Sequence, residues 1–116
     1  MQAKTKAFGT LAALVVLVVP IAANAVYNDN ITGIISHVRV YDTGLVLVRL
    51  QNQPTSHPAC QPGYFAMDTA LDPDIRAMML SRALVARASG QPINIGYDNA
   101  GSCAQGYIRL HQIGDG

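Results

Sequence analysis

Five short apolar segments, separated by turn residues, make up most of the chain after residue 26. They are rich in β-branched and other apolar residues, which favours strands, and they cover residues 34–41, 45–51, 64–67, 92–97 and 107–113. A longer segment lies between the third and the fourth of them. Asp72 is a suitable N-cap there, and Pro73 fits the first helical position. Gly90 suits a left-handed C-cap, so residues 73–88 are predicted to form an α-helix.

The predicted order is strand, strand, strand, helix, strand, strand, preceded by a polar lead-in over residues 26–30. Five strands with a helix between the third and the fourth are typical of the OB-fold, so a mostly β domain closed into a small Greek-key β-barrel is expected. The alternative is an open α+β sheet with the helix packed on one face. No repeat or linker interrupts residues 26–116, which are expected to form a single domain.

The first two strands are predicted to form a hairpin through the three-residue loop Asp42-Thr43-Gly44, with Gly44 in the left-handed conformation. This loop sets a register with two faces. The face expected to point to the core pairs Val40 with Val46, Val38 with Val48 and Ser36 with Leu50. The outer face pairs Tyr41 with Leu45, Arg39 with Leu47 and His37 with Arg49.

The predicted helix is apolar on two sides rather than along one stripe. One side carries Ile75, Met78, Met79, Ala83 and Ala86, and the other carries Ala77, Leu80, Leu84 and Ala88. A helix that is apolar on two sides is usually covered on two sides. In a domain this small the second cover is either another subunit, which predicts a homo-oligomer, or absent, which leaves a partly exposed leucine pair on a monomer.

The first 25 residues have the three regions of a secretory signal peptide. Lys4 and Lys6 give a positive start, residues 11–19 form a short apolar run, and Ala23-Asn24-Ala25 supplies the small residues that a signal peptidase needs. The apolar run is too short for a membrane span, which needs about 20 residues. We therefore expect cleavage before Val26 and a mature protein in the periplasm or outside the cell, with no membrane span.

Cys60 and Cys103 are the only two cysteines of the chain. Export takes them to an oxidising compartment, so they are predicted to form a disulfide. The bond closes a loop of 43 positions, which is worth about 3–4 kcal/mol in the chain-entropy treatment. The spacing is too long for a C-x-x-C redox motif.

The charge of the mature chain argues against a nucleic-acid partner. After residue 25 there are six arginines, no lysine and seven aspartates, which gives a net charge of −1 with neutral histidines. A nucleic-acid binder normally carries a basic excess that neutralises phosphates. No polybasic membrane patch is present either.

No pattern in the chain predicts catalysis, a metal site or a cofactor. His37, His57 and His111 share no ligand spacing with one another or with a cysteine. The chain has no G-x-S-x-G nucleophile motif and no glutamate, and capping explains Asp72 and Asp74 at the helix start. We therefore expect a protein that is not an enzyme.

The residues that suggest binding gather beside two predicted loops. His37, Arg39, Tyr41 and Arg49 share the outer face beside the first hairpin loop, and Tyr97 and Asn99 border the loop between the last two strands. In OB-folds these two loops flank the ligand-binding face. Arginine pairs with carboxylates and a tyrosine ring packs on a sugar, so the pattern suits a sugar acid.

Residues 80–95, with the sequence LSRALVARASGQPINI, resemble the helix, turn and strand of the subtilase cytotoxin B-subunit family. The chain also resembles a broader group of short, exported, largely uncharacterised bacterial proteins with two cysteines. The toxin resemblance implies a secreted OB-fold that forms a pentamer and binds sialylated glycans.

Together these features predict an exported, non-enzymatic binding module whose partner is a glycan. The alternative is a periplasmic inhibitor or envelope protein whose partner is an envelope or host protein.

Overall fold

The computed structural model of the protein describes residues 27–116. The predicted signal peptide and its cleavage site lie outside these residues. No helix within residues 27–116 is both long and apolar enough to cross a membrane.

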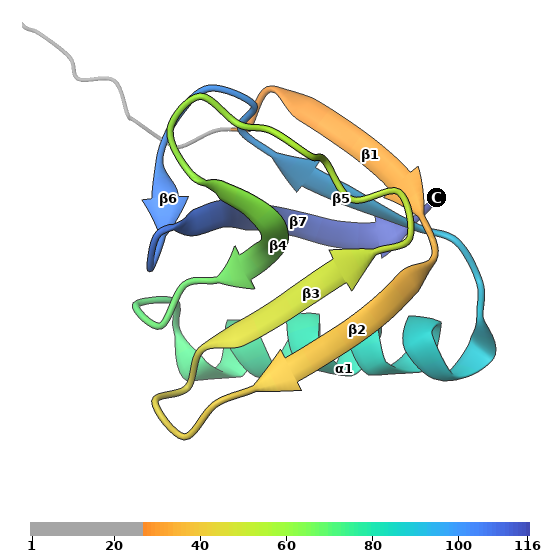
Figure 1. The fold of residues 1–116 in the computed structure, drawn as a ribbon. Coiled ribbons are helices and arrows are strands. Elements are labelled where there is room, and N and C mark those ends of the chain that lie inside the picture. Colours follow the sequence, from red (N-terminus) through yellow and green to blue (C-terminus); the bar gives the residue numbers. More distant parts are fainter. Residues whose placement is uncertain (1–26) are drawn as a thin grey trace, which may run out of the picture.

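The protein is mostly β with one helix, as the sequence predicts (Figure 1). The helix α1 covers Pro73–Ser89. The strands are β1 (Asp29–Gly33), β2 (Ile35–Val40), β3 (Val46–Leu50), β4 (Gln61–Met67), β5 (Ile93–Tyr97), β6 (Cys103–Ala104) and β7 (Tyr107–Asp115). All five predicted strands are therefore found, while β1 and the short β6 were not predicted.

The strands form one curved sheet that is not closed into a barrel. Its order is β1-β5-β7-β4-β3-β2, with β6 beside β7. The expected barrel closure is absent, and the open α+β alternative is confirmed. The physical reason lies at Ile34, which alone separates β1 from β2. A single residue leaves no room for a turn, so the two end strands cannot fold back on each other. Instead, β1 pairs with β5 and β2 pairs with β3.

Strand β1 corrects the prediction of a polar lead-in over residues 26–30. Polar side chains hold this strand beside its neighbours: the Asn30 side-chain amide donates to Asn94 Oδ1 at 2.7 Å, and Asn94 Nδ2 donates to Thr32 Oγ1 at 3.0 Å. These hydrogen bonds join β1 to β5 across residues far apart in sequence, which a local hydrophobic pattern cannot reveal.

The predicted β2–β3 register is confirmed over four pairs, from Val40 opposite Val46 to His37 opposite Arg49. Gly44 has φ +90°, as the loop requires. The register shifts at Ser36, so that Ile35 and not Ser36 lies opposite Leu50. This bulge turns the apolar Ile35 into the core, where it is 2% exposed. The core-face prediction also fails for Val40, which is 59% exposed at the end of the strand.

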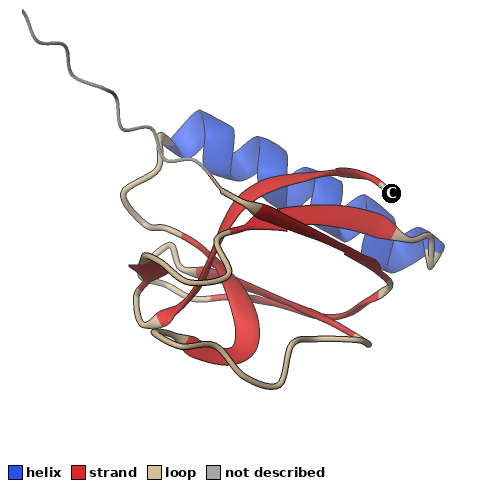
Figure 2. Cartoon of the chain, turned by 90° about the horizontal axis from the view of Figure 1, so that it is seen from above, coloured by secondary structure: helices blue, strands red, loops and turns tan. Residues whose placement is uncertain are grey.

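The main core lies between α1 and the inner face of the sheet (Figure 2). Ala83 and Ala86 are the buried residues of the helix, and they pack among strand residues that share an apolar, fully enclosed environment: Ile35, Val46, Val48, Leu50, Phe65, Met67, Ile93, Ile95, Ile108 and Leu110. The helix caps are as predicted. Asp72 accepts a hydrogen bond from the Asp74 N–H at 2.8 Å, and the left-handed Gly90 donates to Ala86 O.

The predicted disulfide joins Cys60 to Cys103, whose Cα atoms are 5.6 Å apart. His57 ties the same two loops together. Its Nδ1 accepts backbone N–H groups from Ala59 at 3.1 Å and Cys60 at 3.0 Å, while its Nε2 contacts Asp98 O at 2.8 Å. A backbone N–H can only donate, so Nδ1 carries no proton and Nε2 donates to the carbonyl. The segments leading into β4 and β6 are thus held by one covalent bond and one histidine.

Removing the disulfide is expected to lower the free energy of unfolding by about 3–4 kcal/mol, because the open chain regains the entropy of a loop of 43 positions. The measurement is urea unfolding of the Cys60→Ala/Cys103→Ala variant beside the oxidised protein. Equal unfolding midpoints and slopes for the two proteins would contradict this expectation.

Candidate functional site

The outer face of the sheet, which points away from α1 and the main core, collects the aromatic and charged side chains of four strands. Along β4, Phe65 and Met67 are fully buried in the main core, so Tyr64, Ala66 and Asp68 point to the other side. Along β7, the buried Ile108 and Leu110 alternate with Tyr107, Arg109 and His111 in the same way. Because β4 and β7 are paired, the two polar rows lie beside one another.

Tyr64 is the centre of a cluster on this face, which we call the Tyr64 cluster and which comprises His37, Arg39, Arg49, Tyr64 and Tyr107. The guanidinium carbons of Arg39 and Arg49 lie 5.6 and 5.8 Å from the centroid of the Tyr64 ring. The rings of His37 and Tyr107 meet the same ring edge-on, at centroid distances of 6.5 and 6.2 Å. Both arginines thus lie within cation–π range of a single ring.

The Tyr64 cluster carries positive charge without a matching carboxylate. The ion pairs among residues 27–116 are Arg82 with Asp115 and Arg109 with Asp68, and neither involves the cluster. Arg49 donates to Gly63 O at 3.2 Å, and Arg39 is exposed. Two guanidinium groups with spare donors are therefore presented to solvent in a part of the chain, residues 27–116, that carries six arginines and seven aspartates.

A small second core supports this cluster from beneath. Leu47, Ala66 and Ala104 are buried together, with Leu45, Tyr64 and Tyr107 packed against them. This explains why Leu47 is only 2% exposed although it shares a face with Arg39. Tyr64 and Tyr107 were not among the binding residues predicted from the sequence. The alternation of Tyr107 with Ile108 and Leu110 does put Tyr107 on the face of Arg109 and His111, and the alternation of Tyr64 with Phe65 was the signal that could have placed Tyr64 on the outer face.

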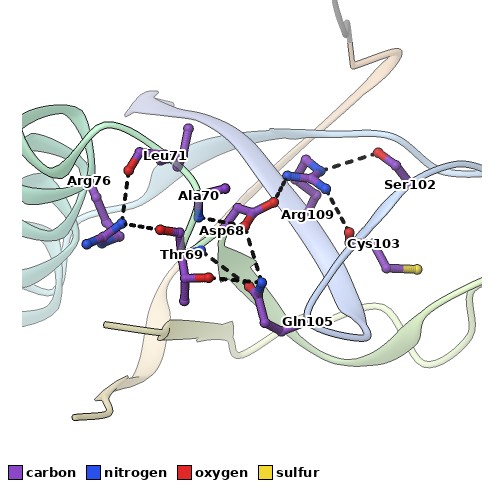
Figure 3. A network of polar contacts seen from close by, with 9 residues as sticks. All are labelled: Asp68, Thr69, Ala70, Leu71, Arg76, Ser102, Cys103, Gln105 and Arg109. Atoms are coloured by element: carbon purple, nitrogen blue, oxygen red, sulfur yellow. Dashed lines mark hydrogen bonds and ion pairs between the residues drawn. The ribbon is translucent and has the colours of Figure 1, made fainter. Parts of the chain in front are cut away.

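A half-buried ion pair between Asp68 and Arg109 lies on the same outer face, within a network of polar contacts (Figure 3). Arg109 Nη1 pairs with Asp68 Oδ2, while its Nη2 donates to Cys103 O at 2.8 Å. Asp68 Oδ1 accepts hydrogen bonds from the Ala70 N–H at 2.9 Å and from Gln105 Nε2 at 3.2 Å. The carboxylate is thus hydrogen-bonded on both oxygens, and the network fixes the turn after β4 to the loops on either side of β6.

These contacts decide the charge state of Asp68. Burial by itself would raise the pKa of its carboxyl group, but the hydrogen bonds from Ala70, Arg109 and Gln105 and the charge of Arg109 outweigh it. The net effect is a pKa below the ordinary value of 3.8. Asp68 is therefore a carboxylate at neutral pH and compensates the charge of Arg109.

A pocket of about 350 Å³ adjoins this ion pair, lined by Asp68, Leu71, Ser102, Arg109, Leu110 and His111. The His111 ring stacks on Tyr27 at a centroid distance of 6.0 Å. Burial lowers the pKa of His111, and the nearby charge of Arg109 lowers it further. The imidazole is therefore neutral at pH 7, and the pocket differs from the positively charged Tyr64 cluster.

The structure brings together only some of the six residues that the sequence predicted to bind a ligand. His37, Arg39 and Arg49 are brought together around Tyr64, and Tyr41 is 42% exposed at the end of the same hairpin. Tyr97 and Asn99 are elsewhere, as the following contacts show.

The Tyr97 ring lies 5.2 Å from the Phe65 ring and packs against the main core, on the other face of the sheet from Tyr64. Burial and the carboxylate of Asp29 raise the pKa of the Tyr97 hydroxyl. Asn99 Nδ2 donates to Asp29 Oδ2 at 3.2 Å. Both side chains thus hold the last loop to the start of β1, which is a structural role.

The site is suited to binding an anion, and no metal cluster accompanies it. Among residues 27–116 no group of three or more His, Cys, Asp or Glu side chains is placed to hold a metal ion. The groups on the outer face that can bind an anion are instead the two guanidinium groups of Arg39 and Arg49, which lie against the Tyr64 ring.

Comparison with known proteins gives no relative from which a role could be carried over. The chain matches no family model, and no curated protein or solved structure is significantly similar to it.

The Asp68→Asn variant is expected to be less stable at neutral pH by about 1.5–3 kcal/mol, the usual worth of a hydrogen bond to a charged group. The pKa of Asp68 is lowered in the folded state, so its contribution is complete above the ordinary pKa of 3.8 and is lost as the pH falls through the folded value. Urea unfolding between pH 7 and pH 3 measures this dependence. Asp42→Asn, in the exposed hairpin loop, is the matched control. A variant at Asp68 that keeps the full acid-dependent loss of stability would refute the assignment.

Proposed function

We propose that this protein is an exported, non-enzymatic binding module that recognises an acidic sugar through the Tyr64 cluster. One observation carries the proposal: Arg39 and Arg49 lie 5.6 and 5.8 Å from one tyrosine ring and have no carboxylate partner among residues 27–116. Guanidinium groups in this situation have hydrogen-bond donors to spare for an anion from outside.

The arrangement favours a carboxylate attached to a ring. A guanidinium group pairs with a carboxylate through two parallel hydrogen bonds, which gives both strength and orientation. The ring of Tyr64 holds both guanidinium groups near one position before a ligand arrives, which reduces the entropy lost on binding. The exposed Tyr41 nearby offers an aromatic surface for the apolar face of a sugar.

Two further features support this ligand class and its location. The resemblance of residues 80–95 to the subtilase cytotoxin B subunits directs attention to sialylated glycans, whose terminal sugar carries a carboxylate. The Cys60–Cys103 disulfide is typical of proteins in oxidising compartments, in line with export to the periplasm or beyond.

A second candidate function, a periplasmic inhibitor or an envelope protein that binds another protein, is favoured by one observation. Met78, Leu84 and Val85 on α1 are 64, 48 and 59% exposed. Large apolar side chains gathered on one exposed surface often mark contacts between proteins.

A glycan array that carries sialylated glycans beside their neutral counterparts tests the ligand class, and we expect binding to the sialylated members only. Calorimetric titration then measures the affinity. Arg39→Gln and Arg49→Gln are each expected to weaken binding about 10- to 100-fold, because each removes a charge-assisted hydrogen bond worth about 1.5–3 kcal/mol. Arg39→Lys keeps the positive charge but loses the planar guanidinium group that forms two parallel hydrogen bonds. It should therefore bind more tightly than Arg39→Gln but more weakly than the unmodified protein.

Arg87→Gln is the matched control, since this exposed arginine lies in the last turn of α1 and should leave binding unchanged. The proposal fails if folded protein binds no acidic glycan, or if Arg87→Gln reduces binding as much as Arg39→Gln does. Retention of one stoichiometric protein from an envelope extract, without glycan binding, would favour the alternative.

A further inference from the structure

The pocket of about 350 Å³ beside the Asp68–Arg109 ion pair lies on the same face of the sheet as the Tyr64 cluster. Two parallel rows of outward side chains lead from the cluster to the pocket. The row on β4 runs from Tyr64 to Asp68, and the row on β7 runs from Tyr107 through Arg109 to His111. At about 3.3 Å per residue, Arg109 and His111 lie roughly 7 and 13 Å beyond Tyr107 along the strand. A short oligosaccharide held at the cluster can span these distances.

The charges that line the pocket cancel one another. The carboxylate of Asp68 compensates the guanidinium group of Arg109, and burial together with the nearby charge of Arg109 keeps His111 neutral at pH 7. The apolar side chains of Leu71 and Leu110 complete the lining. A pocket of this size, with apolar walls and a few polar groups, is typical of sites for small molecules. It therefore favours an uncharged polar group over a second anion.

Two polar groups of the pocket have unused hydrogen-bonding capacity. A neutral imidazole carries one nitrogen that donates and one that accepts, and within residues 27–116 neither ring nitrogen of His111 bonds to another group of the protein. The Tyr27 ring stacks on this imidazole. Ser102 Oγ accepts from Arg109 Nε at 3.3 Å, which leaves its own proton to donate (Figure 3). A sugar hydroxyl both donates and accepts, and so matches His111 and Ser102.

We propose that this pocket is a second subsite, which binds a neutral sugar unit linked to the acidic sugar held by the Tyr64 cluster. His111 and Ser102 bind its hydroxyl groups, and Leu71 lies against its less polar face. The inference rests on the proposed function, because the Tyr64 cluster holds the acidic end of the ligand. The subsite adds affinity to a sialylated oligosaccharide, and its few contacts do not hold a neutral sugar alone.

Calorimetric titration of the oxidised protein with the methyl glycoside of sialic acid, with 3′-sialyllactose and with 6′-sialyllactose tests the subsite. We expect at least one trisaccharide to bind about tenfold more tightly than the methyl glycoside, the worth of one or two added hydrogen bonds. His111→Leu has a side chain of similar volume without the two nitrogens, and should bind all three ligands alike. His111→Gln, whose amide donates and accepts, should keep part of the difference.

Two further variants separate the subsite from the Tyr64 cluster. Arg39→Gln should weaken the binding of all three ligands by the same factor, since each carries the carboxylate. Gln91→Leu, at an exposed position after α1, is the control for a polar-to-leucine change and should alter no affinity.

The outcomes distinguish failure of the subsite from failure of the proposed function. Equal affinities of the unmodified protein for all three ligands, or an equal loss of affinity for all three in His111→Leu, would overturn the subsite and leave the proposed function standing. If no sialylated ligand binds to the folded protein, the proposed function fails and the subsite fails with it.

Discussion

The parallel pairing of β4 and β7 is the constraint on which the rest of the structure depends. It places Ala66 beside Arg109, and so brings the outward side chains of two distant segments into one surface. Parallel strands need a long crossover connection, and here it contains α1, β5 and β6, with α1 covering the inner face of the sheet. The disulfide and His57 hold the chain just before β4, and the Asp68–Arg109 pair holds it just after. A covalent bond, a histidine and an ion pair thus hold the two ends of β4 in place.

Local features of the sequence were sufficient for part of the fold. Asp72, Pro73 and Gly90 marked the helix because capping depends on residues within one turn of it. The hairpin register followed from a three-residue loop, and failed only at the Ser36 bulge, where burial of Ile35 outweighed regular pairing. The strand β1 depends on its pairing with β5, whose residues lie 60 to 68 positions away, and no local pattern encodes such a contact.

The candidate site was predictable to the extent that it lies on the hairpin. Arg39 and Arg49 were placed on one face by the register, and the structure keeps them together. Tyr64, which both arginines approach, comes from another strand whose neighbour β7 the sequence did not reveal. Tyr97 was predicted to bind a ligand because it lies close to a loop. Its spacing of two and four residues from the buried Ile95 and Ile93 instead puts it on their face of the strand, which points into the core. The alternation of side chains along the strand was therefore a better guide to the direction of Tyr97 than its closeness to a loop.

The Tyr64 cluster lies on the outer face of the sheet, and α1 packs on the inner face. The sheet therefore separates the proposed ligand-binding surface from the helix.

Mapping the ligand onto the protein by NMR tests the central claim most directly. The oxidised, isotopically labelled protein would be titrated with 3′-sialyllactose, and with lactose as the neutral control. We expect amide shifts to change with the sialylated sugar alone, and the changes to centre on β2, β3 and β4 around Tyr64. Shifts confined to α1 or to the loop that carries Asn99, or equal shifts with lactose, would contradict it.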